Sequence, residues 1–361
     1  MKKNKVLHIS ETFVTGVYTY IQSICAFTAQ NSNIETHIIY SPNREGTDQL
    51  NFKKDFSPGT KLISLPMQRE VSFSKDYKSL QQLKKAIKQI KPDVIHLHSS
   101  KAGVLGRIAA KSWPTARVYY TPNGYAFLRE DISPLKQKFF KLIENWIPKI
   151  YGGTTIACGD TEYEYAKAFG KSLMVRNGIN LSELDNIKVS SNSELKTIVT
   201  LGRISAQKNP KLFNAIAEKY PDINFIWIGD GELQHLLTAS NIEITGWLDR
   251  ESALKQLAKH DVYIQTSLWE GLPFTIIEAM ALQKTILATN VIGNKDAVSH
   301  QNNGFLCDNL EGFEKAIHQL KSEPELLKTF GEQSQKLTYE KFDRNKNFRG
   351  LIKIYLNQGN L

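Results

Sequence analysis

The feature that most restricts the fold of this chain is the regular alternation of short apolar runs with longer amphipathic segments. The apolar runs read as strands, and the segments between them carry apolar residues at helical spacing. The strand-like runs include 5–10, 35–40, 61–66, 93–98, 153–158, 197–201, 224–228, 261–265 and 285–289. Strands and helices that alternate in this way predict an α/β fold with mostly parallel sheets in both halves.

The length of 361 residues favours two domains over a single core. A polar stretch rich in Ser, Asn and Asp separates the two runs of alternation and is the best linker. We therefore divide the chain into a first domain at 1–180, a linker at 181–196 and a second domain at 197–340. The remaining residues, 341–361, predict a C-terminal helix that is able to pack back on the first domain.

Composition and short segments favour a protein of the cytoplasm. No run approaches the ~20 apolar residues that a membrane span needs. The basic start, 1–5, is followed by an apolar run that is too short for an export signal and is interrupted by His8, so we expect a strand there. Cys25, Cys158 and Cys307 have no metal-binding spacing and suit a reducing compartment.

The net charge of +10 is concentrated in the first half. Residues 1–180 hold 26 Lys and Arg against 14 Asp and Glu, and the rest hold 20 against 22. Such a half suits an anionic partner, which could be nucleic acid, an anionic membrane surface or a phosphorylated acceptor. A solubilising surface explains the charge equally well. The chain lacks the signatures of common nucleic-acid-binding modules, so nucleic acid is the least favoured partner. The aromatic and basic helix expected at 134–150 fits either core packing or a membrane surface.

The stretch 267–281 places two carboxylates, Glu270 and Glu278, on either side of a break made by Gly271 and Pro273. Glu270 is expected on a loop after a strand, and a helix is expected from Phe274 onward. The first N–H groups of that helix have no partner within it, which suits an anionic ligand such as a diphosphate.

The first half offers fewer signals. Gly16 follows the first strand alone, without the G-x-G-x-x-G pattern, so a nicotinamide dehydrogenase has no support there. His98 ends a buried strand and Lys101 follows it, and Asn123 lies in a Pro-Asn-Gly turn after the next strand. These positions are expected at the carboxyl edge of a sheet, where ligands of such folds bind.

Three patterns together resemble a known family. They are Gly202-Arg203 with Lys208 five residues after the arginine, the Glu270–Glu278 pair, and the turn Arg176-Asn-Gly-Ile179. This combination resembles retaining glycosyltransferases of the GT-B fold, family GT4 (glycosyl transferases group 1). The segments 99–103 and 121–127 further resemble a bacterial subgroup that builds capsule and O-antigen polysaccharides. The resemblance implies two Rossmann-like, doubly wound parallel-sheet domains facing a cleft.

The resemblance also implies roles for individual residues. Arg203 and Lys208 would neutralise the donor diphosphate and, with Glu270 at the donor sugar, form the catalytic set. Glu278 would bind the ribose. The full donor-binding set is Gly16, Gly202, Arg203, Lys208, Gly229, Gly246, Glu270, Gly271, Phe274, Thr275 and Glu278. His98, Lys101 and Asn123 are expected on the acceptor side.

The implied reaction moves a sugar from a nucleotide diphosphate, with a UDP-sugar favoured, to a lipid-linked or oligosaccharide acceptor. No metal or other cofactor is expected, and no D-x-D triplet occurs. The implied location is the cytoplasm, including the inner face of the bacterial plasma membrane.

Two departures from the family pattern leave alternatives open. Asn123 stands where the family commonly has His, and Thr15 stands where it usually has a second glycine. An asparagine can position a sugar but cannot carry a proton at neutral pH. A sugar-nucleotide epimerase of the same fold and a non-catalytic sugar-nucleotide-binding subunit are the alternatives. At the level of single residues, Arg203, Lys208, Glu270 and Glu278 could instead form salt bridges between domains.

Overall fold

The computed structural model describes residues 3–43, 52–68, 70–129, 131–189 and 194–358, and it divides the chain into two compact units. Unit 1 contains 1–128, 132–177 and 345–361, and unit 2 contains 129–131 and 178–344. The C-terminal helix therefore belongs to unit 1. The described part of the stretch that was expected as a linker, 181–189 and 194–196, belongs to unit 2.

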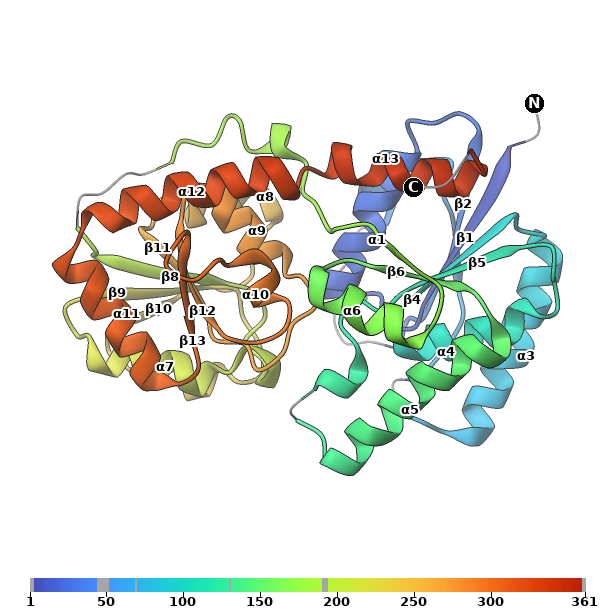
Figure 1. Cartoon of the computed structure of the whole chain (residues 1–361), viewed down its shortest axis with the longest axis horizontal. Helices are drawn as coiled ribbons and strands as arrows, with labels where there is room; N and C mark the ends of the chain where they lie inside the picture. Colours follow the sequence, from blue (N-terminus) through green and yellow to red (C-terminus); the bar gives the residue numbers. More distant parts are fainter. Residues whose placement is uncertain (1–2, 44–51, 69, 130, 190–193, 359–361) are drawn as a thin grey trace. The chain divides into compact units, whose positions relative to one another are not determined.

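Unit 1 is built on a parallel sheet that has seven strands within the described residues (Figure 1). In spatial order they are β3 (Lys61–Ser64), β2 (Ile34–Tyr40), β1 (Asn4–Ser10), β4 (Val94–His98), β5 (Arg117–Thr121), β6 (Thr154–Ala157) and β7 (Ser172–Met174). Every residue of β4 is buried, as expected for a central parallel strand covered on both faces. The polar segment 41–60, rich in Asn, Pro, Gly and Ser, is expected from its sequence to be a loop. Its residues 44–51 lie outside the described residues, and 52–55 form the short helix α2 (Phe52–Asp55).

Helices follow the strands of unit 1 in sequence. They are α1 (Thr15–Thr28), α3 (Phe73–Ile90), α4 (Ser100–Ala110), α5 (Pro134–Tyr151), α6 (Asp160–Phe169) and the C-terminal α13 (Arg344–Leu356). Arg117 ties α13 to the sheet by donating to the carbonyl oxygens of Ile354 and Tyr355. The Tyr355 hydroxyl bonds Nδ1 of His96 at 2.5 Å.

Unit 2 repeats the arrangement on a parallel sheet of six strands, counted among the described residues. In spatial order they are β10 (Ile242–Ile244), β9 (Asn224–Ile228), β8 (Thr197–Leu201), β11 (Val262–Gln265), β12 (Thr285–Thr289) and β13 (Gly304–Cys307). The helices are α7 (Pro210–Lys219), α8 (Arg250–Leu257), α9 (Phe274–Ala281), α10 (Asn294–Ala297), α11 (Leu310–Ser322) and α12 (Glu325–Lys341). Both sheets are doubly wound, which confirms the predicted fold class.

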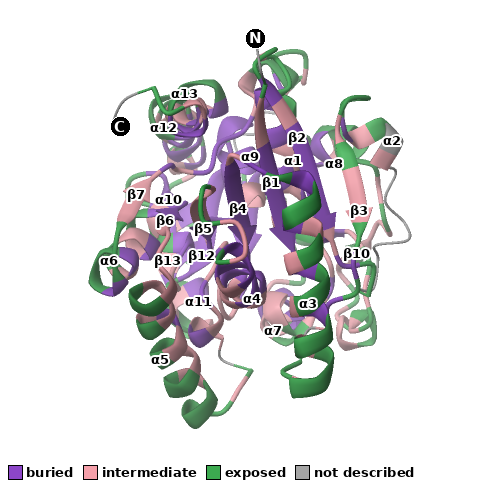
Figure 2. Ribbon diagram, turned by 90° about the vertical axis from the view of Figure 1, so that its right-hand side faces the viewer, coloured by how far each residue is buried: buried purple, intermediate pink, exposed green. Residues whose placement is uncertain are grey.

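The strand order reverses direction once in each sheet, between β1 and β4 in unit 1 and between β8 and β11 in unit 2. In open α/β sheets, ligands bind outside the carboxyl ends of the strands at such a reversal. At the reversal point of unit 1, β4 and most of β1 are buried (Figure 2). At that of unit 2, β11 and the middle of β8 are buried as well. None of the described helices combines the length and the hydropathy required to span a bilayer.

Candidate functional site

The reversal point of unit 2 brings together two loops that carry most of the predicted donor residues. One loop follows β8 and contains Gly202 through Lys208, and the other follows β11 and leads to Glu270. Because β8 and β11 are hydrogen-bonded neighbours, their carboxyl ends deliver these loops to the same place. The structure thus joins residues that are 62 positions apart in sequence, since Lys208 Nζ lies 2.8 Å from Glu270 Oε1.

Glu270 is the centre of this site. Its carboxylate is buried, and Oε1 accepts hydrogen bonds from Lys208 Nζ at 2.8 Å, Gln265 Nε2 at 2.8 Å and Ser267 Oγ at 2.7 Å. Gln207 Nε2 approaches Oε2 at 3.4 Å. These donors compensate the loss of hydration and fix the carboxylate in one orientation. Our sequence reading missed Gln265 and Ser267, although their spacing from Glu270 along the strand and loop was visible.

Glycines shape the backbone beside this carboxylate. Gly202 and Gly229 have φ values of 139° and 135°. A Cβ at Gly229 would lie 2.3 Å from the Gly202 carbonyl oxygen, so only glycine lets the two strand ends approach this closely. Gly246, with φ of 74°, forms a bridge to Gly229. Arg203 lies at the same turn, half-exposed, with its guanidinium 3.1 Å from Glu232 Oε2.

The N-terminus of α9 provides backbone donors close to Glu270 in sequence. Pro273 caps the helix without a side-chain hydrogen bond, and the first turn has no acidic residue. Phe274 and Thr275 are the first residues of the helix, as predicted. The carbonyl oxygen of Gly271 packs against Gly293, where a Cβ would lie only 1.4 Å away. A helix start of this kind favours an anion.

Glu278 lies inside α9 and is buried with a partner that our sequence reading missed. Arg250, the first residue of α8, donates to Glu278 Oε1 at 2.8 Å and to Glu183 Oε2 at 2.5 Å. The Glu278 carboxylate raises the pKa of Arg250, so the guanidinium stays charged. No spacing rule would have linked Arg250 to Glu278, because 28 residues and a buried strand separate them.

Each of the four predicted residues has an ion-pair partner within its own unit. Lys208 pairs with Glu270, Arg203 with Glu232, and Glu278 with Arg250, and all these residues belong to unit 2. The four predicted residues are therefore held within one unit.

In unit 1, the loop after β1 holds Thr15 and Gly16 at the start of α1. Thr15 has a positive φ of 50°, and Gly16 is exposed, with no atom within 4 Å of the position that a Cβ would take. Internal packing therefore does not require a glycine at position 16. Glu11, which our sequence reading missed, is buried beside this loop and accepts a hydrogen bond from the Ala102 N–H at 3.1 Å.

The side chain of His98, which we expected on the acceptor side, is not accessible to a bound acceptor. It is fully buried, and its Nε2 lies 2.9 Å from Nδ1 of His8. His96 lies beside them and bonds Tyr355 and Thr121 through its two ring nitrogens. Nitrogens of the three rings lie within 4.8 Å of one another, a spacing that could hold a metal ion. The hydrogen bonds of His96 make this cluster a neutral network in the core, where burial lowers the pKa of His8 to about 3.

Lys101, which we expected on the acceptor side, is bound by neighbouring groups of unit 1. Its ammonium donates to the carbonyl oxygens of Gln68 and Glu70 at 2.8 and 2.6 Å and lies 2.6 Å from Asp76 Oδ1. These three acceptors match the three donors of an ammonium group. Lys101 therefore fixes the segment before α3, and its partners lie too far away in sequence to have been predicted.

Asn123 lies in a turn at the carboxyl edge of the sheet, as expected. Its φ of 53° and that of Gly124, 92°, explain the Asn-Gly pair. The Gly124 N–H donates to Glu162 Oε1 at 2.9 Å, which ties the turn to α6.

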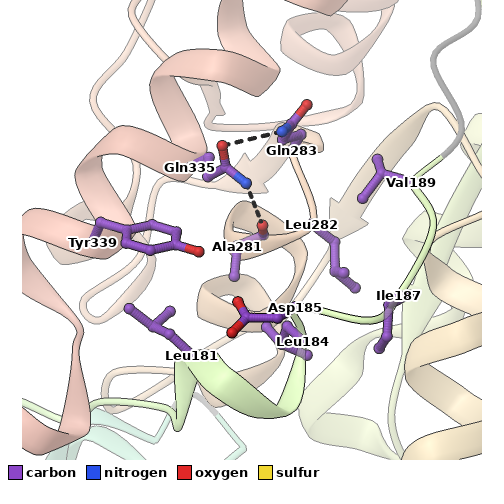
Figure 3. A pocket seen from close by; sticks show the side chains of 10 residues that line it. All are labelled: Leu181, Leu184, Asp185, Ile187, Val189, Ala281, Leu282, Gln283, Gln335 and Tyr339. Atoms are coloured by element: carbon purple, nitrogen blue, oxygen red, sulfur yellow. Dashed lines mark hydrogen bonds between the residues drawn. The ribbon is translucent and has the colours of Figure 1, made fainter.

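A pocket of about 210 Å³ in unit 2 contains none of the predicted residues (Figure 3). It lies at the C-terminal end of α9, whereas the predicted diphosphate contacts lie at the N-terminal end. Gln335 of α12 donates to the Ala281 carbonyl oxygen there and accepts from Gln283. The first of these bonds satisfies the carbonyl oxygen of Ala281, the last residue of α9.

Two sequence families match the chain, one in each half. The family described as "Glycosyl transferase 4-like" matches residues 5–152, and "Glycosyl transferases group 1" matches residues 182–337. The second match contains the whole site around Glu270.

Individual proteins agree with these matches. The chain is 33% identical over 277 residues to the Escherichia coli UDP-Gal:alpha-D-GlcNAc-diphosphoundecaprenol alpha-1,3-galactosyltransferase, covering 66% of this chain and 68% of the relative. A sucrose-phosphate synthase from Thermosynechococcus elongatus has a similar structure, with a TM-score of 0.82, 16% identity and coverage of 98% and 99%. Anabaena HepE, solved with UDP and glucose, gives a TM-score of 0.78 at 15% identity, with coverage of 98% and 100%.

Proposed function

This chain belongs to the group 1 glycosyl transferases, and from that membership we propose that it transfers a sugar from a UDP-sugar to a lipid-linked acceptor with retention of anomeric configuration. The observation that carries the proposal is the site at the β8–β11 reversal of unit 2. There the buried Glu270 is held by Lys208 beside the Gly202 turn, and the N-terminus of α9 has no side-chain cap. Cations and N–H groups at such a point suit a diphosphate leaving group.

The donor and acceptor classes are inferred from similar proteins. HepE was solved with UDP, and the Escherichia coli relative is named for a UDP-sugar donor and a diphosphoundecaprenol-linked acceptor. We propose the same classes here, in surface-polysaccharide synthesis at the cytoplasmic side of the bacterial membrane. An oligosaccharide acceptor remains within this proposal.

The proposed chemistry needs no protein nucleophile. The bond between the anomeric carbon and the diphosphate oxygen breaks while the acceptor oxygen bonds to the same face of that carbon. The departing diphosphate takes the acceptor's proton. Lys208 and Arg203 neutralise the charge that develops on the leaving group, and Glu270 orients the donor sugar. Glu278 accepts hydrogen bonds from the ribose. We propose that the reaction proceeds without a metal ion and therefore expect it to continue after chelation with EDTA.

Substitution of the site residues tests this assignment. We expect Lys208→Ala and Glu278→Ala each to lower kcat/KM by at least about 100-fold, because each removes a charged contact to the donor. The measurements are UDP release and the anomeric configuration of the product by NMR. Lys211→Ala and Glu251→Ala are matched controls at exposed positions of α7 and α8 and should retain activity.

Stability must be measured alongside activity. Lys208→Ala leaves the buried Glu270 without its cation, so a lowered Tm would make its lost activity ambiguous. Glu278→Ala is the cleaner variant, because Arg250 is 45% exposed and keeps its pairing with Glu183. Near-normal turnover in a folded Glu278→Ala protein would refute the assignment. An isomerised sugar would indicate an epimerase, and tight donor binding without turnover would indicate a non-catalytic subunit.

A further inference from the structure

The outer face of α5 in unit 1 carries a continuous apolar stripe that is exposed. Its members are Leu135, Phe139, Leu142, Trp146 and Ile150, whose exposed fractions are 78%, 53%, 55%, 52% and 62%. At about 100° per residue, these positions fall within an arc of about 80° on the helix surface. Figure 2 shows how much of α5 is exposed compared with the strands beside it. Core packing, one of the two explanations left open by the sequence, therefore does not account for the stripe.

The charge around this stripe is entirely positive. Every exposed position of α5 is either apolar or lysine: Pro134, Leu135, Lys136, Lys138, Phe139, Lys141, Leu142, Trp146, Lys149 and Ile150. By helical geometry, Lys136 lies on one side of the stripe and Lys138 and Lys149 lie on the other. The single acidic residue of the helix, Glu144, is buried on the opposite face.

The orientation of the helix is fixed by that buried carboxyl group. Glu144 Oε1 accepts hydrogen bonds from Ser100 Oγ and from the Tyr120 hydroxyl, both at 2.8 Å. Ser133 caps the first turn by accepting from the Lys136 N–H. Rolling the helix to bury the stripe would break the Glu144 bonds, so unit 1 holds the apolar side outward.

We propose that α5 docks unit 1 on an anionic membrane as a helix lying in the plane of the interface. The apolar stripe would enter the boundary of the acyl chains, and the lysines would contact lipid phosphates. A lipid bilayer fits better than a protein partner, because the exposed positions of α5 are all apolar or lysine. The Asn145 amide at the border of the stripe already accepts a hydrogen bond from Lys149 Nζ at 2.7 Å. Lysine beside aromatic and aliphatic residues is the usual composition of such interfacial helices.

The placement of α5 adds a link to the reaction, and this link rests on the proposed function. In a parallel sheet the chain leaves each strand at the carboxyl edge, so the first turn of α5 lies at the same edge as the Asn123 turn. Leu135 and Phe139 are thus the part of the stripe nearest to that edge. A lipid-linked acceptor would reach unit 1 at the edge where our sequence reading placed its acceptor side.

Vesicle flotation with the full chain and no nucleotide tests the docking. We expect binding to vesicles of phosphatidylglycerol in phosphatidylcholine that weakens with salt. Phe139→Ser with Trp146→Ser should lower the partition coefficient at least tenfold. Trp247→Ser, which removes an exposed tryptophan from unit 2, should leave it unchanged. Lys136→Glu with Lys138→Glu should weaken binding and reduce its salt dependence.

Fluorescence gives a second, independent readout. Brominated lipids should quench Trp146, and Trp146→Phe should abolish that quenching while flotation persists. Absence of flotation, or equal flotation by the wild type and the Phe139/Trp146 double variant, overturns the proposal. A third outcome is a wild type that is dimeric and does not bind vesicles, with a double variant that is monomeric. That result would show that the stripe joins two copies of the chain instead.

The test separates this inference from the proposed function. Flotation requires no donor, and sugar transfer can be measured with a detergent-solubilised acceptor in the absence of vesicles. Flotation without any transfer would refute the function and leave the docking intact. Transfer without flotation would refute the docking and leave the proposed function intact.

Discussion

Glu270 and Lys284 show two ways in which unit 2 holds a buried charge. Glu270 accepts hydrogen bonds from several donors, which fix its carboxylate in one orientation. Lys284 is only 1% exposed, and its ammonium donates to the Ala258 carbonyl oxygen at 2.8 Å. Burial lowers the pKa of Lys284 to about 8. Burial of Lys284 therefore lowers the stability of the folded state, whereas Glu270 is held in position as part of the site.

We predict that Lys284→Met stabilises the protein at pH 7 by about 1–3 kcal/mol. The folded pKa is lower than the ordinary value of 10.5, so the folded state binds the proton more weakly than the unfolded state. The penalty is present in full below pH 8 and disappears as the pH rises through the unfolded value. Urea unfolding at pH 7 measures the gain, with the exposed Lys259→Met as the control. A net loss of stability in Lys284→Met would contradict the argument.

Single residues also show what the sequence could predict about the site. That Lys208 and Glu270 lie in one site, and that α9 starts at Phe274, was predictable because strand ends, turn residues and family spacing mark these positions. The role of Lys101 was not, because its acceptors lie on a segment about 30 positions earlier that only tertiary packing brings near. His98 was misplaced for a related reason. A strand end looks the same in sequence whether its last side chain faces a ligand or the core.

At the scale of elements, α13 stands out in unit 1 because it contacts residues that are more than 200 positions earlier in the sequence, such as Arg117 and His96. Phe348 packs against Tyr20 and Phe27 of α1, and Tyr355 bonds His96 of β4. Amphipathicity alone predicted a helix here but did not choose between the two domains. The choice depends on side chains such as Arg117, whose bonds to the last turn of α13 no local pattern reveals.

We predict that Tyr355→Phe destabilises unit 1 by about 1–3 kcal/mol, because it leaves the buried Nδ1 of His96 without a partner. Hydrogen exchange should show faster opening of α13 and the strands beneath it, and little change in unit 2. Tyr77→Phe is the matched control, since Tyr77 is 65% exposed on α3. Equal exchange in the two variants would mean that the hydroxyl contributes nothing.

For the whole molecule, the buried histidines connect folding to pH. Burial holds the pKa of His8 at about 3 and the pKa values of His96 and His98 well below their ordinary range, so all three stay neutral in the folded state. The unfolded chain takes up their protons once the pH falls below about 6.5. Stability contributed by these neutral rings is therefore complete above that pH and declines as the pH falls.

We predict a fall in unfolding free energy between pH 6.5 and pH 4.5, by up to about 1.4 kcal/mol per pH unit for each of these histidines. Denaturant unfolding at a series of pH values measures the slope. His8→Asn should reduce the slope of unfolding free energy against pH by up to about 1.4 kcal/mol per pH unit, because unfolding then takes up one proton fewer. Identical slopes for the variant and the wild type would exclude His8 from the acid response.

The overall architecture was the most predictable level. Alternating strands and helices in each half predicted two parallel α/β sheets, because each apolar run needs cover on both faces. The division between the units was less predictable. The polar stretch after residue 180 looked like a linker, yet Leu181, Leu184 and Ile187 line a pocket with residues of α9 and α12.

The membership of α13 in unit 1 has a consequence for how the protein is made. Most of unit 2 is an insertion within the sequence of unit 1. The chain segments at the two ends of this insertion are hydrogen-bonded to each other. The Ile179 N–H donates to the Phe342 carbonyl oxygen, and the Arg344 N–H donates to the Ile179 carbonyl oxygen. Residues 178–344, which make up most of unit 2, are all synthesised once Arg344 has been added to the chain. The domain that is synthesised first, by contrast, must wait for Phe348 and Tyr355 before its core is complete, so it is the last to finish folding.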